Sequence, residues 1–266
     1  MAKLSRISSI WVAVLGAVAC ALIASFVLLP AAVLGSPDEV LEPLGPSIAT
    51  FWEGGNAAIP PALSDLVDYW REWHAIKVMI CAPLLVVAIA MAMMLWSRYL
   101  ADEHAGGAGS AIGATLSTLL AALVAGLLAI NIQATAVPLV ALFPQVPADS
   151  KDPAVDNPIS QLRDSLATGQ TSSDHKDVSQ LVVDQVWQYT AIIAVAMVVL
   201  AVVMGVLTVR LLLRFRRSRG NRPIRVMCAA TGLVLGICAL GYFAISVLAV
   251  ISLLDTSSTA AGLLGA

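Results

Sequence analysis

Residues 185–209, QVWQYTAIIAVAMVVLAVVMGVLTV, contain no charged side chain, and residues 210–225, RLLLRFRRSRGNRPIR, contain seven arginines and no acid. An α-helix rises 1.5 Å per residue, so about 20 apolar residues are enough to cross the hydrocarbon core of a bilayer. Positive charge in a short loop marks the cytoplasmic side of a membrane. The two segments together predict a membrane-spanning helix that ends in the cytoplasm.

The composition of the whole chain agrees with this interpretation. Of its 266 residues, 59% are hydrophobic and 12% are charged, and the mean hydropathy is +0.88. Soluble domains contain about 25% charged residues, and disordered chains combine low hydrophobicity with high net charge. The composition therefore excludes an ordinary water-soluble enzyme and a disordered chain.

Four more uncharged stretches of at least 20 residues occur along the chain. The longest, 104–148, has room for a hairpin of two helices, but Asn131, Gln133 and Pro138 leave only a short apolar stretch after the first crossing. One crossing with a kinked extension is therefore the preferred interpretation. The predicted fold is an all-α polytopic membrane protein, a single integral membrane domain over residues 1–266, with five transmembrane helices at 10–34, 76–96, 111–132, 189–213 and 226–254.

The distribution of charge predicts how these helices are oriented. With the amino terminus in the cytoplasm and the carboxyl terminus outside, the cytoplasmic segments carry 10 of the 15 basic residues. These segments include loops 97–110 and 214–225. The outer loops 35–75 and 144–188, with the carboxyl-terminal tail, carry 15 of the 17 acids. A hairpin in the third stretch would turn the arginines outward, against the bias of multi-pass proteins. A cleaved signal peptide is disfavoured because the first apolar run is longer than such a peptide needs.

The first outer loop predicts an amphipathic helix before the second crossing. Its apolar residues follow helical spacing, with acids on the opposite face. We expect this helix to lie near the outer surface, with Trp70 and Trp73 at headgroup depth, where aromatic rings concentrate. The apolar positions are Leu63, Leu66, Val67, Trp70 and Trp73.

The second outer loop predicts two helices. Asn157 and Pro158 match an N-cap followed by a proline in the first turn, and Gly169 suits a C-cap, which predicts a helix over 158–168. A second helix is expected to begin near Asp174 and to run into the fourth crossing. The segments before the second and fourth crossings resemble each other, since Ser64-Asp65-Leu66-Val67 parallels Ser179-Gln180-Leu181-Val182. The two halves of the chain could therefore be a two-plus-two repeat, or the two segments could be amphipathic independently of each other.

The densest cluster of chemically distinctive side chains is 70–77, WREWHAIK. His74 titrates near neutral pH beside the predicted membrane surface, which suits a proton or substrate role. Lys77 is one turn from Trp73, within reach of a cation–π contact. The alternative is interfacial anchoring, with Lys77 snorkelling to the headgroups. These eight residues are similar to the tryptophan–histidine–basic segment of anthrone-oxygenase-like membrane proteins, and no activity is carried over from that resemblance.

Two further candidates lie inside the predicted spans. Asn131 and Gln133 are the strongest polar groups of the third crossing; such amides usually hydrogen-bond to neighbouring helices, and a role in a transport pathway is the alternative. Gly232 and Gly236 form a Gly-x-x-x-Gly pair that permits close helix packing, within the chain or between protomers.

The arginine-rich segment predicts contact with anionic phospholipids. Attraction to an anionic leaflet is worth about 1 kcal/mol per basic residue near the surface. Nucleic acid is not needed to explain this charge, because membrane topology already requires it. Pro223 is expected to break the helix between the fourth and fifth crossings. The predicted lipid contacts are Arg214, Arg216, Arg217, Arg219 and Arg222.

No metal site, cofactor or catalytic residue is predicted. His104 falls on the cytoplasmic side and His74 and His175 on the outer side, so the three histidines cannot converge. Asp174, His175 and Asp177 could hold a weakly bound cation together with acids of the first outer loop. A solvated acidic loop is the commoner explanation of such a cluster. The sequence has no zinc, phosphate-loop, dinucleotide or serine-hydrolase motif.

These observations lead to three functional hypotheses. The first is a non-enzymatic accessory, scaffold or assembly subunit that meets protein partners in the cell envelope through its outer loops. The second is a small transporter or channel subunit, and the third is an intramembrane enzyme that modifies a lipid or quinone at His74. Arginine outnumbers lysine 11 to 4, which suggests a GC-rich bacterial genome and the bacterial cell membrane as the location.

Overall fold

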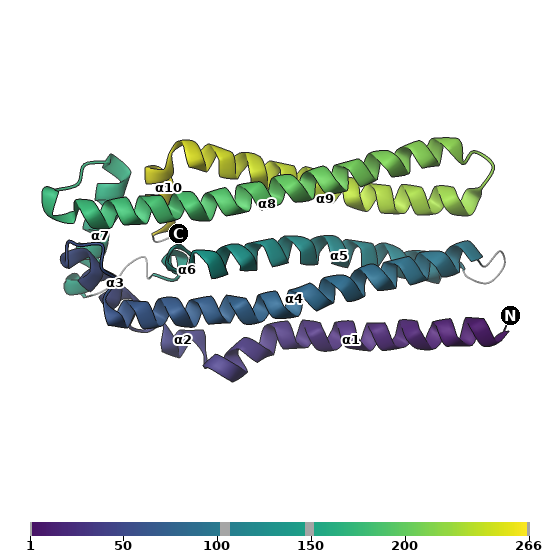
Figure 1. Cartoon of the computed structure of the whole chain (residues 1–266), viewed down its shortest axis with the longest axis horizontal. Helices are drawn as coiled ribbons and strands as arrows, with labels where there is room; N and C mark the ends of the chain where they lie inside the picture. Colours follow the sequence, from purple (N-terminus) through teal and green to yellow (C-terminus); the bar gives the residue numbers. More distant parts are fainter. Residues whose placement is uncertain (1, 102–106, 147–151, 265–266) are drawn as a thin grey trace. The chain divides into compact units, whose positions relative to one another are not determined.

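The computed structural model describes residues 2–101, 107–146 and 152–264, and every regular element in these ranges is helical (Figure 1). Five of the helices are long and apolar enough to cross a membrane. The chain is therefore an all-helical protein with five candidate membrane spans. In chain order the elements are α1 (Ala2–Leu34), α2 (Pro37–Val40), α3 (Leu44–Glu53), α4 (Pro61–Ala101), α5 (Gly107–Ala136), α6 (Pro138–Leu142), η1 (Phe143–Gln145), α7 (Pro153–Thr168), η2 (Ser173–His175), α8 (Lys176–Arg217), α9 (Arg222–Leu254) and α10 (Thr256–Leu263).

Two of the long helices are much longer than one crossing needs. Helix α4 has 41 residues and α8 has 42, which at 1.5 Å per residue gives about 60 Å against about 30 Å of hydrocarbon. The amphipathic segment predicted to lie on the membrane surface is therefore the first part of α4, continuous with the second crossing. The helix predicted near Asp174 is likewise η2 and the first turns of α8.

The chain folds as two compact units, which we call unit 1 and unit 2 and describe separately. Unit 1 comprises residues 1–29, 77–129 and 196–245, and unit 2 comprises 30–76, 130–195 and 246–266. Unit 1 contains parts of all five long helices. Unit 2 contains the short helices, the first part of α4, the first part of α8 and the carboxyl-terminal segment.

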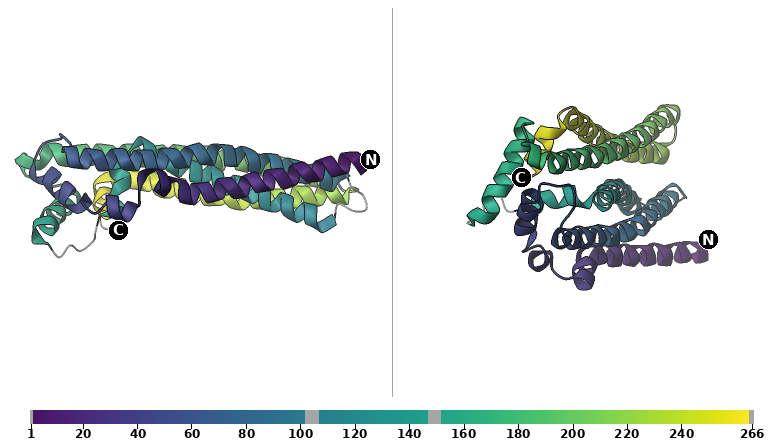
Figure 2. Two further views of the ribbon diagram at one scale, coloured as in Figure 1. Left: turned by 90° about the horizontal axis from the view of Figure 1, so that it is seen from below. Right: turned by 60° about the vertical axis from the view of Figure 1, so that its left-hand side comes forward.

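Unit 2 has a continuous hydrophobic core. Helix α7 packs against both α3 and α10, as the two views of Figure 2 show. Fully buried side chains enter the core from each of its segments. Helices α6 and α10, which lie outside the two predicted outer loops, also contribute to this core. Representative core residues are Leu44, Leu63, Leu142, Leu162, Val178 and Leu264.

Three local features of unit 2 differ from the sequence prediction. Helix α7 begins at Pro153, not Pro158, because Asp152 is the N-cap and its carboxylate accepts from the Ala154 N–H at 3.0 Å. Asp152-Pro153 is the same cap–proline signal as Asn157-Pro158, and the earlier copy is the one that starts the helix. The predicted end is confirmed, since Gly169 adopts φ +65°. Helices α3 and α10 were not predicted.

The break after α5 has a simple cause. Helix α5 ends at Ala136, and Val137 has φ −131° and ψ 70° before Pro138 starts α6. A residue that precedes proline is sterically disfavoured in the helical conformation, and the proline has no N–H to continue the helix. The predicted kink at the end of the third crossing is therefore confirmed as a helix break.

One close contact between helices of unit 1 is made at a glycine. At Gly126 on α5, an added Cβ would lie 2.6 Å from the Tyr242 hydroxyl and 2.8 Å from its ring, so only glycine fits there. The same hydroxyl donates to the Ala122 carbonyl at 2.5 Å. Tyr242 on α9 therefore fits closely against the backbone of α5. Large hydrophobic side chains elsewhere on these helices are exposed, as in a lipid-facing surface.

Candidate functional site

The structure brings together residues that the sequence singled out separately. His74 on α4 and Asn131 on α5, both in unit 2, join through the Nδ1 and Oδ1 atoms at 2.9 Å. A carboxamide oxygen only accepts hydrogen bonds, so Nδ1 is the donor in this contact. Asn131 is buried, with 3% of its surface exposed. A part-buried hydrogen bond therefore links α4 to α5 through two residues that are 57 positions apart in sequence.

Two indole rings lie next to this pair. The Trp70 ring meets the His74 imidazole edge-on, with centroids 5.0 Å apart, and lies parallel to the Trp73 ring at 6.3 Å. Both tryptophans are 8% exposed and belong to the core of unit 2. Both rings therefore pack against protein, and their expected position at headgroup depth stays a prediction. The Trp70 Nε1 atom is buried without a hydrogen-bond partner among the described residues.

Gln133 makes a second connection between helices. Its Nε2 atom donates to the Tyr189 carbonyl on α8 at 2.8 Å, and its side chain is 4% exposed. A carbonyl inside a helix has a second lone pair, so this bond does not compete with the helix's own ladder. Asn131 and Gln133 therefore connect α5 to α4 and to α8 within unit 2.

Lys77 has an aromatic neighbour that the sequence did not indicate. Its Nζ atom lies 5.2 Å from the ring centroid of Phe26 on α1, within unit 1. Cation–π contacts occur within about 6 Å of a ring centroid. The contact of Lys77 with Trp73, one turn earlier, stays a prediction.

Unit 2 contains an aromatic pair that the sequence did not indicate. The His175 imidazole stacks on Trp52 with centroids 4.3 Å apart and an interplanar angle of 18°. Trp52 also donates from Nε1 to the Gln161 side chain at 3.4 Å. The three residues come from distant parts of the chain, so no local spacing could reveal them. His175 therefore packs as an aromatic ring, and its Nδ1 is buried without a partner among the described residues.

The described residues contain no group of three or more His, Cys, Asp or Glu side chains that could hold a metal ion. His104, which the sequence placed on the cytoplasmic side, lies outside the described residues. Asp174 has its carboxylate accepting a hydrogen bond from Ser173 at 2.9 Å, on the exposed surface of η2.

The arginine-rich segment is mostly helical. Arg214, Arg216 and Arg217 belong to the last turn of α8, and Arg222 begins α9, so the connecting turn is only 218–221 and contains Arg219. Asn221 caps α9 by accepting from the Ile224 N–H at 3.1 Å. The break predicted at Pro223 is confirmed, with the proline in the first turn of α9.

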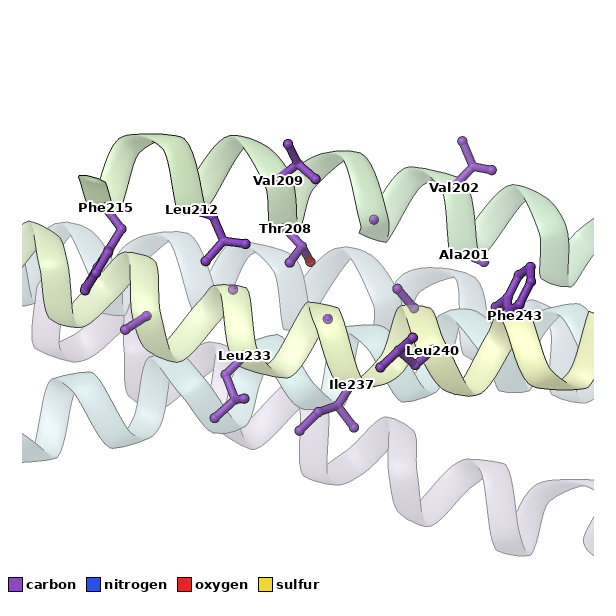
Figure 3. A pocket seen from close by; sticks show the side chains of 15 residues that line it. Ala201, Val202, Thr208, Val209, Leu212, Phe215, Leu233, Ile237, Leu240 and Phe243 are labelled. Carbon is purple, nitrogen blue, oxygen red and sulfur yellow. The ribbon is translucent and has the colours of Figure 1, made fainter. Parts of the chain in front are cut away.

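The glycine pair of α9 faces α8 inside unit 1. A Cβ added at Gly236 would lie 3.4 Å from the Thr208 methyl, and one at Gly232 would lie 3.7 Å from the Leu211 Cβ, both ordinary contacts. Beside this contact is an apolar groove of about 880 Å³ between α8 and α9 (Figure 3). The glycine pair therefore lies at the α8–α9 contact, but alanine would also fit at both positions.

Comparison with known proteins gives no match: no protein family, no curated protein and no solved structure is similar to this chain. The chemistry of the candidate site must therefore be judged from its geometry. His74 bonds to a neutral amide and contacts an indole, and Asn131 and Gln133 bond between helices. Such contacts hold helices in register.

Proposed function

We propose that this protein is a non-enzymatic accessory or scaffold subunit of the bacterial cell envelope, and that unit 2 binds a partner protein. The observation that carries the proposal is the hydrophobic core of unit 2, built from α3, α6, α7, α10 and the first turns of α4 and α8. Segments that only connect membrane helices do not need such a core. A folded surface held beside a membrane is suited to recognition, because binding residues need a rigid scaffold.

The charge of unit 2 supports a particular class of partner. This unit contains 15 of the 17 acidic residues and four of the 15 basic residues of the chain. Carboxylates on α7 and α8, including Asp164, Asp177 and Asp184, are exposed. Complementary charge accelerates encounter and selects partners. The proposed partner therefore presents a basic surface to unit 2.

The proposal also fixes an orientation. The arginines of α8, α9 and their connecting turn belong to unit 1, and the positive-inside rule assigns them to the cytoplasm. With five crossings, the amino terminus is then cytoplasmic, and the outer loops 35–75 and 144–188 and the carboxyl terminus are extracytoplasmic. The partner is accordingly an envelope protein outside the cytoplasmic membrane.

Site-specific photocrosslinking in cells tests the proposal. A crosslinking amino acid at Asp164 or Asp177 should give a discrete adduct with a protein, and one at Leu233, an exposed apolar position of unit 1, should not. With the crosslinker at Asp184, the double variant D164N/D177N should lower the yield of that adduct, and D164K/D177K should lower it further. Equal losses in the two double variants would indicate damage to folding, and adducts from all positions alike would refute a defined partner surface.

Purification in mild detergent separates the remaining hypotheses. A stoichiometric partner protein supports the accessory role. A homo-oligomer that passes solute in liposomes would instead support a transporter or channel, with Asn131 and Gln133 as its polar groups. Bound quinone or lipid that is lost in the His74→Ala variant would support an intramembrane enzyme.

A further inference from the structure

Unit 1 contains a partly open, mainly apolar cavity that none of the functional hypotheses uses. It measures about 740 Å³ and lies among α4, α5, α8 and α9, within the range of 300–1,000 Å³ typical of small-molecule sites. Most of the residues that line it are aliphatic. The apolar lining includes Leu85, Met93, Ala125, Leu200, Met204 and Leu235.

Polar residues also line this cavity, among them Arg210 and Arg214 of α8, Trp96 of α4 and Thr231 of α9. Both arginines are exposed, whereas the indole Nε1 of Trp96 and the hydroxyl of Thr231 are buried away from the cavity surface. Guanidinium groups pair with the oxygens of anionic groups. The two arginines therefore favour a ligand that carries negative charge.

The positions of these groups place them toward one end of the cavity. Trp96 precedes the end of α4 by five residues, and Arg214 precedes the end of α8 by three. The cavity lining continues along α8 from Arg214 back to Leu200, which is about 21 Å at 1.5 Å per residue, against about 15 Å for one leaflet of hydrocarbon. The cavity is therefore long enough for an extended acyl chain below a charged headgroup.

We propose that this cavity binds one anionic phospholipid of the surrounding bilayer, with an acyl chain among α4, α5, α8 and α9 and the phosphate at Arg210 and Arg214. Guanidinium groups match phosphate oxygens in geometry and charge. This site differs from diffuse attraction to the arginine-rich segment. Arg216 and Arg217 belong to the same helix, but they do not line the cavity.

Native mass spectrometry of the full chain in detergent tests the site. Phosphatidylglycerol should bind as one saturable molecule, more tightly than phosphatidylcholine with the same acyl chains. The double variant R210Q/R214Q should weaken phosphatidylglycerol binding about 30-fold, since each basic residue near the headgroups contributes about fivefold. The control R216Q/R217Q removes the same charge from the same helix and should weaken it much less. Equal effects in the two double variants would refute a defined site.

A second pair of variants tests the acyl-chain part of the cavity without changing charge. Ala125→Leu fills the cavity and should reduce saturable binding, whereas Ala244→Leu adds the same volume at an exposed position of α9 outside it and should not. Inorganic phosphate should not displace the lipid. Unchanged binding in Ala125→Leu, or full displacement by phosphate, would show that only the headgroup is recognised and would overturn the proposal.

Discussion

Replacing Gly55 with alanine should destabilise unit 2 by more than the cost of placing alanine in a left-handed backbone conformation. Gly55 follows α3 with φ +64°, and a Cβ built there overlaps the carbonyl oxygen of Asp174. That carbonyl belongs to η2, whose His175 ring stacks on Trp52 of α3. Relief of the overlap therefore requires η2 to move away from α3, because neither backbone can rotate out of the contact.

The magnitude can be worked from two contributions. A left-handed backbone conformation costs an alanine about 1–2 kcal/mol, and forcing extra volume into a packed contact costs about 1–3 kcal/mol. Gly55→Ala should therefore cost about 2–5 kcal/mol. Gly169 is a matched control, because it has φ +65° and no atom within 4 Å of a built Cβ. Gly169→Ala should cost only the first contribution.

Hydrogen exchange of the full chain in detergent micelles measures the difference. The slowest amides of α7 report opening of unit 2, because α7 packs on both α3 and α10. Each 1.4 kcal/mol changes an opening equilibrium about tenfold, so Gly55→Ala should accelerate their exchange about 30-fold or more. If the two alanine variants exchange at the same rate, η2 does not pack against the end of α3 as described.

Three further perturbations test other parts of the structure. Gly126→Ala should lower the stability of the purified chain in thermal unfolding by about 1–3 kcal/mol, because its Cβ would overlap a tyrosine ring on α9. Gly241→Ala is the control, because a Cβ there has no atom within 4 Å. Equal stability of the two variants would contradict the α5–α9 contact. His74→Ala should cost about 1–3 kcal/mol in chemical denaturation by leaving the buried amide on α5 without its imidazole partner, and a cost near zero would contradict that hydrogen bond. In a cysteine-free background, Ser258→Cys should react with a membrane-impermeant maleimide added outside cells and Arg219→Cys should not; the reverse pattern would invert the proposed topology.

The sequence alone determined the five long helices and several helix ends. Uncharged runs of 20 or more residues permit few structures other than spanning helices, because backbone groups in hydrocarbon must be satisfied within the segment. The ends at Gly169, Pro138 and Pro223 were predictable because a left-handed C-cap and a proline act on their immediate neighbours. The start of α7 was mistaken because two cap–proline signals occur five residues apart.

The tertiary structure alone decided what the predicted faces contact. The periodicity of 63–73 identified an apolar face correctly, but a protein core and a lipid headgroup region select the same residues. The periodicity therefore could not show that Trp70 and Trp73 pack in a protein core. The His74–Asn131 bond and the Trp52–His175 stack join residues 57 and 123 positions apart. Local sequence patterns carry no information about such pairs, because the distance between two side chains depends on how whole helices pack.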